Sequence, residues 1–301
     1  MSEPNQILDN EAASKVWKEY ENMSNIEYTE KILAKIDALI VLNNSIKKEL
    51  DNDVIFFWID PIISKFTFHT SSFLQLFAGT KIKIEGKDLR IFDEPSVLVL
   101  FRIILENYLT FYYIFCDSTS REEKEFRVNI WKYCGLKQRN EFDVEQEELK
   151  RKQANEFIEL TTIKEKMICS PYFKTLKKDE QNSILKGVKP RLYSWTKIME
   201  VSGIRKKLFK NIYGYKSNYA HSEFISILQL NSSVYGFNSL AKEHYTLLLI
   251  HMLVSKFIDD LCNLFPSAKG YCEGLNDSFQ REINFLKWLL TNESLDSQTI
   301  K

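Results

Sequence analysis

Turn-forming residues are scarce in this chain, and that scarcity limits its possible folds more than any other feature. Only nine Gly and six Pro occur among 301 residues. β-Sandwiches and barrels need turn signals about every 8–12 residues, so the sequence favours long helices. The hydrophobic share of 44% and the charged share of 27% are those of an ordered globular protein. The prediction is an all-α, multi-helix bundle.

Capping residues and apolar spacing locate the helices. Ser24 and Glu27 form a capping-box pattern at the start of the first helix. The apolar stripe of that helix is predicted to contain Leu33, Ile36, Ile40, Ile46 and Leu50. Asp60-Pro61 is predicted to begin a second helix that ends at Gly79, and Pro95 a third that runs to about residue 117. A second capping box is expected at Ser120 and Glu123.

Strand is expected only at residues 80–92, where polar and apolar residues alternate around Glu85-Gly86-Lys87. This pattern predicts a small hairpin. The rest divides into a polar arm at 1–23, a single all-helical domain at 24–292 and a polar tail at 293–301. Within the domain, the strongly charged stretch near 141–168 predicts a helical excursion from the bundle.

The cellular setting is predicted from one apolar run and five cysteines. The run at 97–116 is long enough to span a bilayer, but Arg102 and Glu106 would each cost about 2.5–3.5 kcal/mol at its centre. A buried core helix, with no membrane, is therefore expected. The cysteines form no C-x-x-C pair and follow a polar N-terminus, which predicts reduced thiols in a cytoplasmic protein without a zinc site.

Four histidines are candidates for chemistry. His69, His244 and His251 lie within apolar stripes, where a hydrogen-bonded structural role is expected. His221 differs, because it follows a basic stretch and lies in a segment of small and polar residues. Ser217 and Asn218 precede it by four and three residues, within reach of the imidazole on a helix. The nearby cations that could bind phosphate are Arg205, Lys206, Lys210 and Lys216.

This pattern suits cleavage of a phosphodiester without a metal or cofactor. A histidine can take the proton from an RNA 2′-hydroxyl or give one to the leaving oxygen, and a cation can stabilise the charge that develops on phosphorus. The alternative is ordinary: a histidine near a helix end and a basic helix face both occur without any catalytic role.

Arg102 and Glu106 stand four residues apart in the most apolar helix. Charges are almost never buried without partners. They are interpreted either as an intrahelical ion pair or as the lining of a polar cleft that orients site residues on a neighbouring helix.

Two segments together carry a family resemblance. One is residues 100–109, LFRIILENYL, and the other is Tyr213, Ser217 and His221 in the spacing Tyr-x-x-x-Ser-x-x-x-His. They resemble a bacterial all-helical family that is itself similar to the HEPN (higher eukaryotes and prokaryotes nucleotide-binding) superfamily. That resemblance implies a helical bundle, often a homodimer, and a metal-independent endoribonuclease of a stress-response toxin or phage-defence system.

Carried over to this sequence, the resemblance makes His221 the motif histidine and Ser217 the motif polar residue. Lys216 stands where the family has arginine, and a lysine lacks the bidentate fork of a guanidinium. The expected function is thus an endoribonuclease acting on RNA, as a homodimer, with an antitoxin or defence protein as partner. The alternative is a non-catalytic helical scaffold that binds a protein or nucleotide. A metal-dependent hydrolase using carboxylates of 141–165 is disfavoured, because no matching histidines accompany them.

Overall fold

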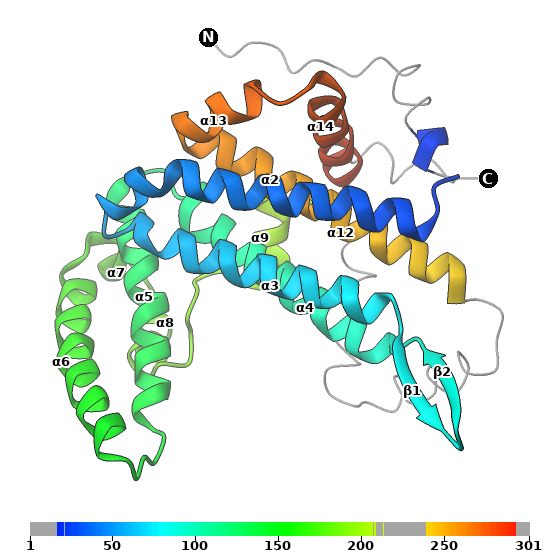
Figure 1. The fold of residues 1–301 in the computed structure, drawn as a ribbon. Helices are drawn as coiled ribbons and strands as arrows, with labels where there is room; N and C mark the ends of the chain where they lie inside the picture. The colour runs from blue at the N-terminus through cyan, green and yellow to red at the C-terminus, as the bar shows by residue number, and fades with distance from the viewer. Residues whose placement is uncertain (1–16, 21, 207, 209–212, 214–238, 293–301) are drawn as a thin grey trace. The chain divides into compact units, whose positions relative to one another are not determined.

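The computed structural model of the chain describes residues 17–20, 22–206, 208, 213 and 239–292, and in these the predicted all-α fold is confirmed (Figure 1). The longer helices are α2 (Asn25–Asp51), α3 (Ile59–Phe77), α4 (Glu94–Phe111), α5 (Arg121–Asn140), α6 (Glu147–Cys169), α12 (Ser239–Leu264) and α14 (Asp277–Thr291). The shorter ones are η1 (Phe56–Trp58), η2 (Tyr112–Cys116), α7 (Pro171–Thr175), α8 (Lys178–Leu185), α9 (Trp195–Val201) and α13 (Pro266–Glu273). Two strands, β1 (Thr80–Ile84) and β2 (Lys87–Ile91), complete the described part.

The chain divides into two compact units. Unit 1 combines Met1–Phe111 with Met199–Lys301, and unit 2 is Tyr112–Ile198. The sequence pattern indicated only a charged excursion near 141–168. Unit 2 extends beyond this predicted excursion, because α6 packs along α5 and also contacts α7. The elements that flank the charged helix therefore belong to the same unit.

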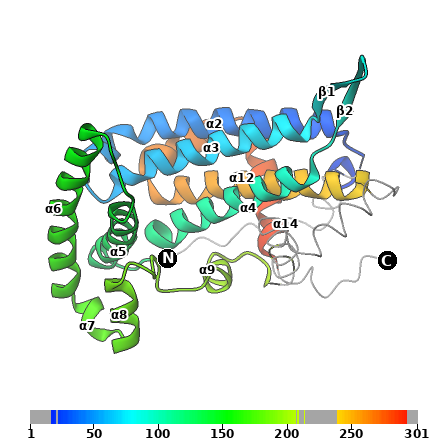
Figure 2. The same ribbon diagram turned by 90° about the horizontal axis from the view of Figure 1, so that it is seen from below.

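Four long helices, α2, α3, α4 and α12, lie alongside one another in unit 1 (Figures 1 and 2). Phe257 of α12 marks their shared core, because its ring lies 4.8 Å from that of Phe66 on α3 and 4.5 Å from that of Phe111 on α4. α14 packs against α12, and α13 contacts both α2 and α12. Burial of such aromatic side chains is a main source of stability in a helical core.

The first helix begins as predicted, but its buried face differs. Ser24 accepts from the Glu27 backbone N–H at 3.3 Å and Glu27 accepts from the Ser24 N–H at 2.7 Å, which completes the capping box. The expected positions Leu33 and Ile40 are wrong, since both are 43% exposed. The core face is instead formed by Tyr28, Ile32, Lys35, Ile36, Leu39, Leu42, Ile46 and Leu50. Leu33 and Ile40 are seven residues apart and therefore share one side of the helix, more than about 100° around from the centre of the buried face.

α3 begins at Ile59 rather than at an Asp60 cap, and no side chain caps it. The Asp60 carboxylate instead accepts from the Asn43 side chain of α2, so it links two helices. The predicted stop is confirmed: α3 ends at Phe77, and Gly79 adopts a φ of 88°, a left-handed conformation that suits glycine.

The predicted hairpin is also confirmed. β1 and β2 pair antiparallel from Thr80↔Ile91 to Ile84↔Lys87. Glu85 and Gly86 form the two-residue turn, with φ values of 49° and 78°. Positive φ at both positions is the signature of a type I′ turn, whose twist matches that of paired strands. The hairpin projects from the ends of α3 and α4 (Figure 1).

Unit 2 has a core of its own. α5 begins at Ser120, whose side chain accepts from the Glu123 N–H at 3.1 Å. The predicted capping box is only half formed, because the Glu123 carboxylate accepts from Thr119 at 2.9 Å instead of from Ser120. The core cluster consists of Phe126, Ile130, Tyr133, Cys134, Ile163, Met167, Phe173 and Ile184.

Glu94–Cys116 is the described helix that is long and apolar enough to cross a membrane, and 61% of its apolar window is buried within the structure. That burial is what the sequence predicted for a core helix. The expectation that every cysteine is a reduced thiol is wrong for Cys262 and Cys272, which form a disulfide. Cys116, Cys134 and Cys169 are free thiols.

Candidate functional site

Three residues singled out from the sequence meet in unit 1. Arg102 and Glu106 form the expected ion pair on α4, with 2.8 Å between Nε and Oε1. The Tyr213 hydroxyl donates to the same Glu106 oxygen at 3.0 Å, and the Arg102 guanidinium lies 5.3 Å from the Tyr213 ring centre. Arg102 Nη2 also donates to the Tyr213 hydroxyl at 3.5 Å. The two segments that carry the family resemblance therefore contact each other.

Partial burial and mutual charge shape the chemistry of this trio. Burial alone would lower the pKa of Arg102, but the hydrogen bond and charge of Glu106 outweigh it and raise the pKa. Burial, followed by the charge of Glu106, raises the pKa of the Tyr213 hydroxyl. At neutral pH Arg102 is thus a guanidinium and Tyr213 a neutral phenol, which donates to Glu106. The contacts of Arg102 and Glu106 with Tyr213 can hold the backbone at Tyr213 in place, and Arg102 supplies a positive charge.

Of the predicted phosphate-binding residues, Arg205 and Lys206 are described. Arg205 is half-buried and its backbone N–H donates to the Leu290 carbonyl at 3.1 Å, while Lys206 is exposed. Lys210, Lys216, Ser217, Asn218 and His221 lie outside the described residues. The proposed catalytic group is accordingly known from the sequence alone.

A small apolar recess in unit 1 is lined in part by Ile204 and Leu208, on either side of Arg205 and Lys206 in the sequence. Its walls come from α4, α12, α14 and the chain before Tyr213, namely Phe101, Leu105, Ile204, Leu208, Leu249, Leu253 and Leu290. Leu208 lines the recess together with Phe101 and Leu105, the residues directly before Arg102 and Glu106 on α4. All lining residues that the structure describes are apolar, so they offer no chemistry of their own.

The other three histidines differ from one another. His69 is half-buried, and His244 Nε2 lies 3.3 Å from the Tyr20 carbonyl oxygen. His251 is fully buried, yet neither ring nitrogen has a hydrogen-bond partner among the described residues. The structural role expected of His251 fits its burial, but the expected hydrogen bond is not found there.

A partly buried polar cluster joins α2 to α14 and was not predicted. The Glu282 carboxylate accepts from Lys31 at 2.6 Å, from Lys35 at 2.5 Å and from the Tyr20 hydroxyl. Lys35 is completely buried, and burial lowers the pKa of its amine to about 8 despite the opposing effect of Glu282. The sequence signal was present, because Lys35 falls on the Ile32–Ile36–Leu39 stripe of α2.

A second unpredicted group links α4 to α12. Asp260 accepts from Lys256 at 2.5 Å and from the Tyr108 hydroxyl at 2.8 Å, and all three side chains are buried. Burial raises the pKa of Asp260, although Lys256 and Tyr108 act in the opposite direction. Such groups are held in place by their buried partners, so they are interpreted as structural.

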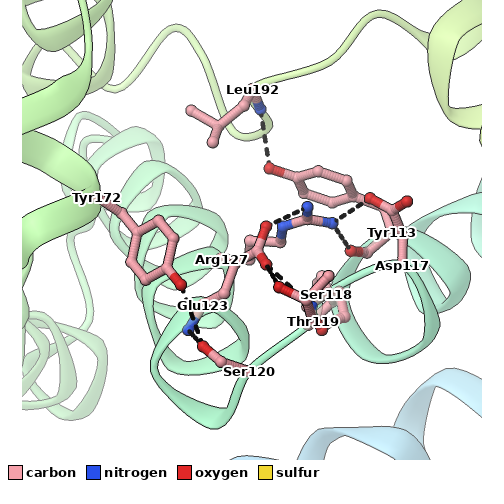
Figure 3. A network of polar contacts seen from close by, with 10 residues as sticks. Tyr113, Asp117, Ser118, Thr119, Ser120, Glu123, Arg127, Tyr172 and Leu192 are labelled. Atoms are coloured by element: carbon pink, nitrogen blue, oxygen red, sulfur yellow. Dashed lines mark hydrogen bonds and ion pairs between the residues drawn. The ribbon is translucent and has the colours of Figure 1, made fainter.

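Unit 2 contains a network around a buried cation, Arg127 (Figure 3). The Arg127 guanidinium, 2% exposed, donates to Asp117 at 2.7 Å, to Glu123 at 2.5 Å and to the Tyr113 carbonyl. It also lies 4.4 Å from the Tyr113 ring centre, and the Tyr113 hydroxyl accepts from the Leu192 N–H at 3.0 Å. Arg127 on α5 thus holds the π-turn at Tyr113 and the following Asp117, so we interpret the network as structural.

Neither metal ligands nor known relatives identify the site. In the part of the chain that the structure describes, no group of three or more His, Cys, Asp or Glu side chains could hold a metal ion. The chain matches no protein-family model, no curated protein and no solved structure. The resemblance to the HEPN superfamily therefore stays a prediction.

Proposed function

We propose that this chain is a metal-independent endoribonuclease of the HEPN type. The observation that carries the proposal is the contact of Tyr213 with Arg102 and Glu106. Tyr213 is the first residue of the element that contains His221, and Arg102 and Glu106 belong to the other element of the resemblance, over 100 residues earlier in the sequence. Contact between two such distant short motifs is expected if they form one site.

In the proposed reaction, His221 takes the proton from a ribose 2′-hydroxyl. The 2′-oxygen then bonds to the adjacent phosphorus and the bond from phosphorus to the 5′-oxygen breaks. The products are a 2′,3′-cyclic phosphate and a 5′-hydroxyl, whose oxygen takes the proton from the protonated His221 and so restores the neutral imidazole. Lys216 stabilises the charge on the phosphorane, Ser217 or Asn218 positions the imidazole, and Arg205, Lys206 and Lys210 bind neighbouring phosphates. Arg102, Glu106 and Tyr213 act as positioning residues.

The assembly and biological role follow from the resemblance. A homodimer would place two His221 segments in one complex, and an antitoxin or another defence protein would restrain the activity. A role as a stress-response or phage-defence toxin in the cytoplasm is part of the same proposal.

The test is cleavage of mixed cellular RNA in the presence of a chelator. His221→Ala is expected to lower the rate by about 10²–10⁴-fold, because positioned proton transfer contributes that much. Lys216→Ala should also lower the rate, and Lys216→Arg should retain or increase it, because arginine restores the bidentate cation of the family motif. His69→Gln, which changes a half-buried histidine on α3, is the matched control. Cleavage that persists unchanged in both alanine variants would refute the proposed site.

A second candidate is favoured by one residue, Lys216, which stands in the position of the motif arginine. In that case the chain is a non-catalytic helical scaffold for a protein or nucleotide partner. Absence of cleavage by the unmodified protein and by Lys216→Arg would support the scaffold.

A further inference from the structure

The hairpin of β1 and β2 places most of its charged side chains on one face and most of its apolar side chains on the other. Lys81 pairs with Arg90, and Lys83 pairs with Asp88. Successive side chains of a strand point to opposite faces, so these four residues share one face. The other face carries Ile82, Ile84, Leu89 and Lys87. We call the face of Lys81, Lys83, Asp88 and Arg90 the basic face.

The cations of the basic face are exposed and close together. Cβ atoms of directly opposed residues lie about 4.5–5.5 Å apart, which applies to Lys81 and Arg90. Residues two apart on a strand, such as Lys81 and Lys83, are separated by about 6.6–6.8 Å. All three cations are exposed, and none forms an ion pair with another residue that the structure describes. One carboxylate, Asp88, leaves a local excess of positive charge.

This arrangement is unfavourable for an unbound hairpin. Like charges directly opposite each other destabilise a strand pair, and an isolated two-stranded hairpin is only marginally stable. The Arg90 stem is nevertheless held against the backbone at Gly79, where an added Cβ would lie 2.8 Å from Arg90 Cγ. A bound polyanion would relieve the repulsion between Lys81 and Arg90.

The residue types on the hairpin indicate which polyanion contacts are possible. No aromatic side chain lies on either strand, and Phe92, just beyond β2, packs against Phe77 with 5.5 Å between ring centres. Base stacking, which needs exposed aromatic rings, is therefore not offered. Contacts from Lys and Arg to phosphate carry no sequence information by themselves.

We propose that the basic face of the hairpin binds the phosphate backbone of RNA, independently of sequence. Only the choice of RNA as the polyanion rests on the proposed function. The chain has 41 basic and 41 acidic residues, so no net charge attracts nucleic acid and a local patch must do so. The hairpin supplies that patch.

The experiment measures binding of a fluorescein-labelled 2′-O-methyl oligo-uridine by anisotropy. This probe lacks the 2′-hydroxyl needed for cleavage, so binding is measured whether or not the protein is a nuclease. The test variant is Lys81→Gln/Lys83→Gln/Arg90→Gln. The control variant, Lys47→Gln/Lys48→Gln/Lys65→Gln, removes the same charge from exposed positions on α2 and α3 of the same unit.

The dependence of binding on salt gives the sharpest readout. Each phosphate contact to a single strand contributes about 0.7 to the slope of log K against log salt concentration. We expect the test variant to bind more weakly at low salt and its slope to be shallower by about 2, with the control variant unchanged. Asp88→Asn should bind more tightly than the unmodified protein, a gain that misfolding cannot produce.

Several outcomes would overturn the inference. They are absence of binding by the unmodified protein, equal losses in the test and control variants, and no gain in Asp88→Asn. Binding to vesicles of anionic phospholipid is measured in parallel. If the test variant loses binding to these vesicles while its salt slope for RNA is unchanged, the inference is also overturned and the basic face binds a membrane surface. Normal binding without any RNA cleavage would refute the nuclease and leave this inference standing.

Discussion

His251 shows at the scale of one residue how burial changes chemistry. The imidazole is completely buried on α12, with the ring centres of Tyr20 and Tyr28 at 5.7 and 6.2 Å. Burial, followed by the charges of Lys35 and Lys31, holds the pKa of His251 well below its usual value. Glu282 from α14 pairs with both lysines. His244 lies on α12, seven residues before His251. The folded protein therefore keeps His251 neutral.

We predict that His251 weakens the fold in mild acid. Its pKa is depressed in the folded state, so below about pH 6.5 the unfolded chain binds a proton that the folded chain does not, and stability falls by about 1.4 kcal/mol per pH unit. His251→Leu should flatten this fall and leave stability at pH 7 nearly unchanged or increased, because two ring nitrogens without partners are removed. Urea unfolding between about pH 5 and 7 measures both effects.

The comparison for that measurement is His69→Leu, which removes a half-buried imidazole from α3 and should change the slope less. Glu282 does not confuse the result, because its pKa is lowered by its lysine partners against the effect of burial, and its own loss of stability comes at lower pH. A fall with pH that is as steep in His251→Leu as in the unmodified protein would contradict the assignment.

At the scale of elements, Arg127 holds the junction between η2 and α5. The apolar helix was predicted to run to about residue 117, and it does so only by widening into the π-turn Tyr112–Cys116. Arg127 donates to the Tyr113 carbonyl of that turn, to Asp117 and to Glu123 (Figure 3). Burial alone would raise the pKa of Glu123, but the Thr119 N–H and Arg127 lower it.

We predict that Arg127→Met destabilises the protein by up to about 3–5 kcal/mol, because it leaves the partly buried carboxylates of Asp117 and Glu123 without their cation. Arg127→Lys should recover only part of the loss, since one ammonium cannot replace the guanidinium fork. Arg139→Met is the matched control on α5: Arg139 pairs with Glu156 at 3.2 Å but is 48% exposed, and such pairs contribute about 0–1 kcal/mol. Urea unfolding compares the three, and equal losses for Arg127→Met and Arg139→Met would contradict this interpretation.

The two compact units define the molecule as a whole. Met167 is fully buried in the core of unit 2, and Met252 is 2% exposed in unit 1. Truncating either to alanine should cost about 2–5 kcal/mol where it lies. If the units are separate cooperative bodies, Met167→Ala reduces amide hydrogen-exchange protection in α5 and α6, and Met252→Ala reduces it in α2 and α12. Equal loss of protection throughout the chain in both variants would instead show one cooperative body.

Local interactions made much of this fold predictable from the sequence. The capping box at Ser24, the left-handed glycine after α3 and the Glu85-Gly86 turn each depend on a few neighbouring residues. The family resemblance placed Arg102, Glu106 and Tyr213 in one predicted site, and the structure brings these three residues into contact.

Only the tertiary structure decided which face of each helix is buried and which charges share a partner. Lys35 is buried although it is charged, because it pairs with Glu282. Leu33 is 43% exposed although it is apolar, because it lies outside the buried face of α2. Arg127 was not singled out from the sequence, and its partners Asp117, Glu123 and Tyr113 come together only in the structure. A sequence pattern records spacing along one helix, whereas the free energy of burying a charge depends on groups that other helices bring to it.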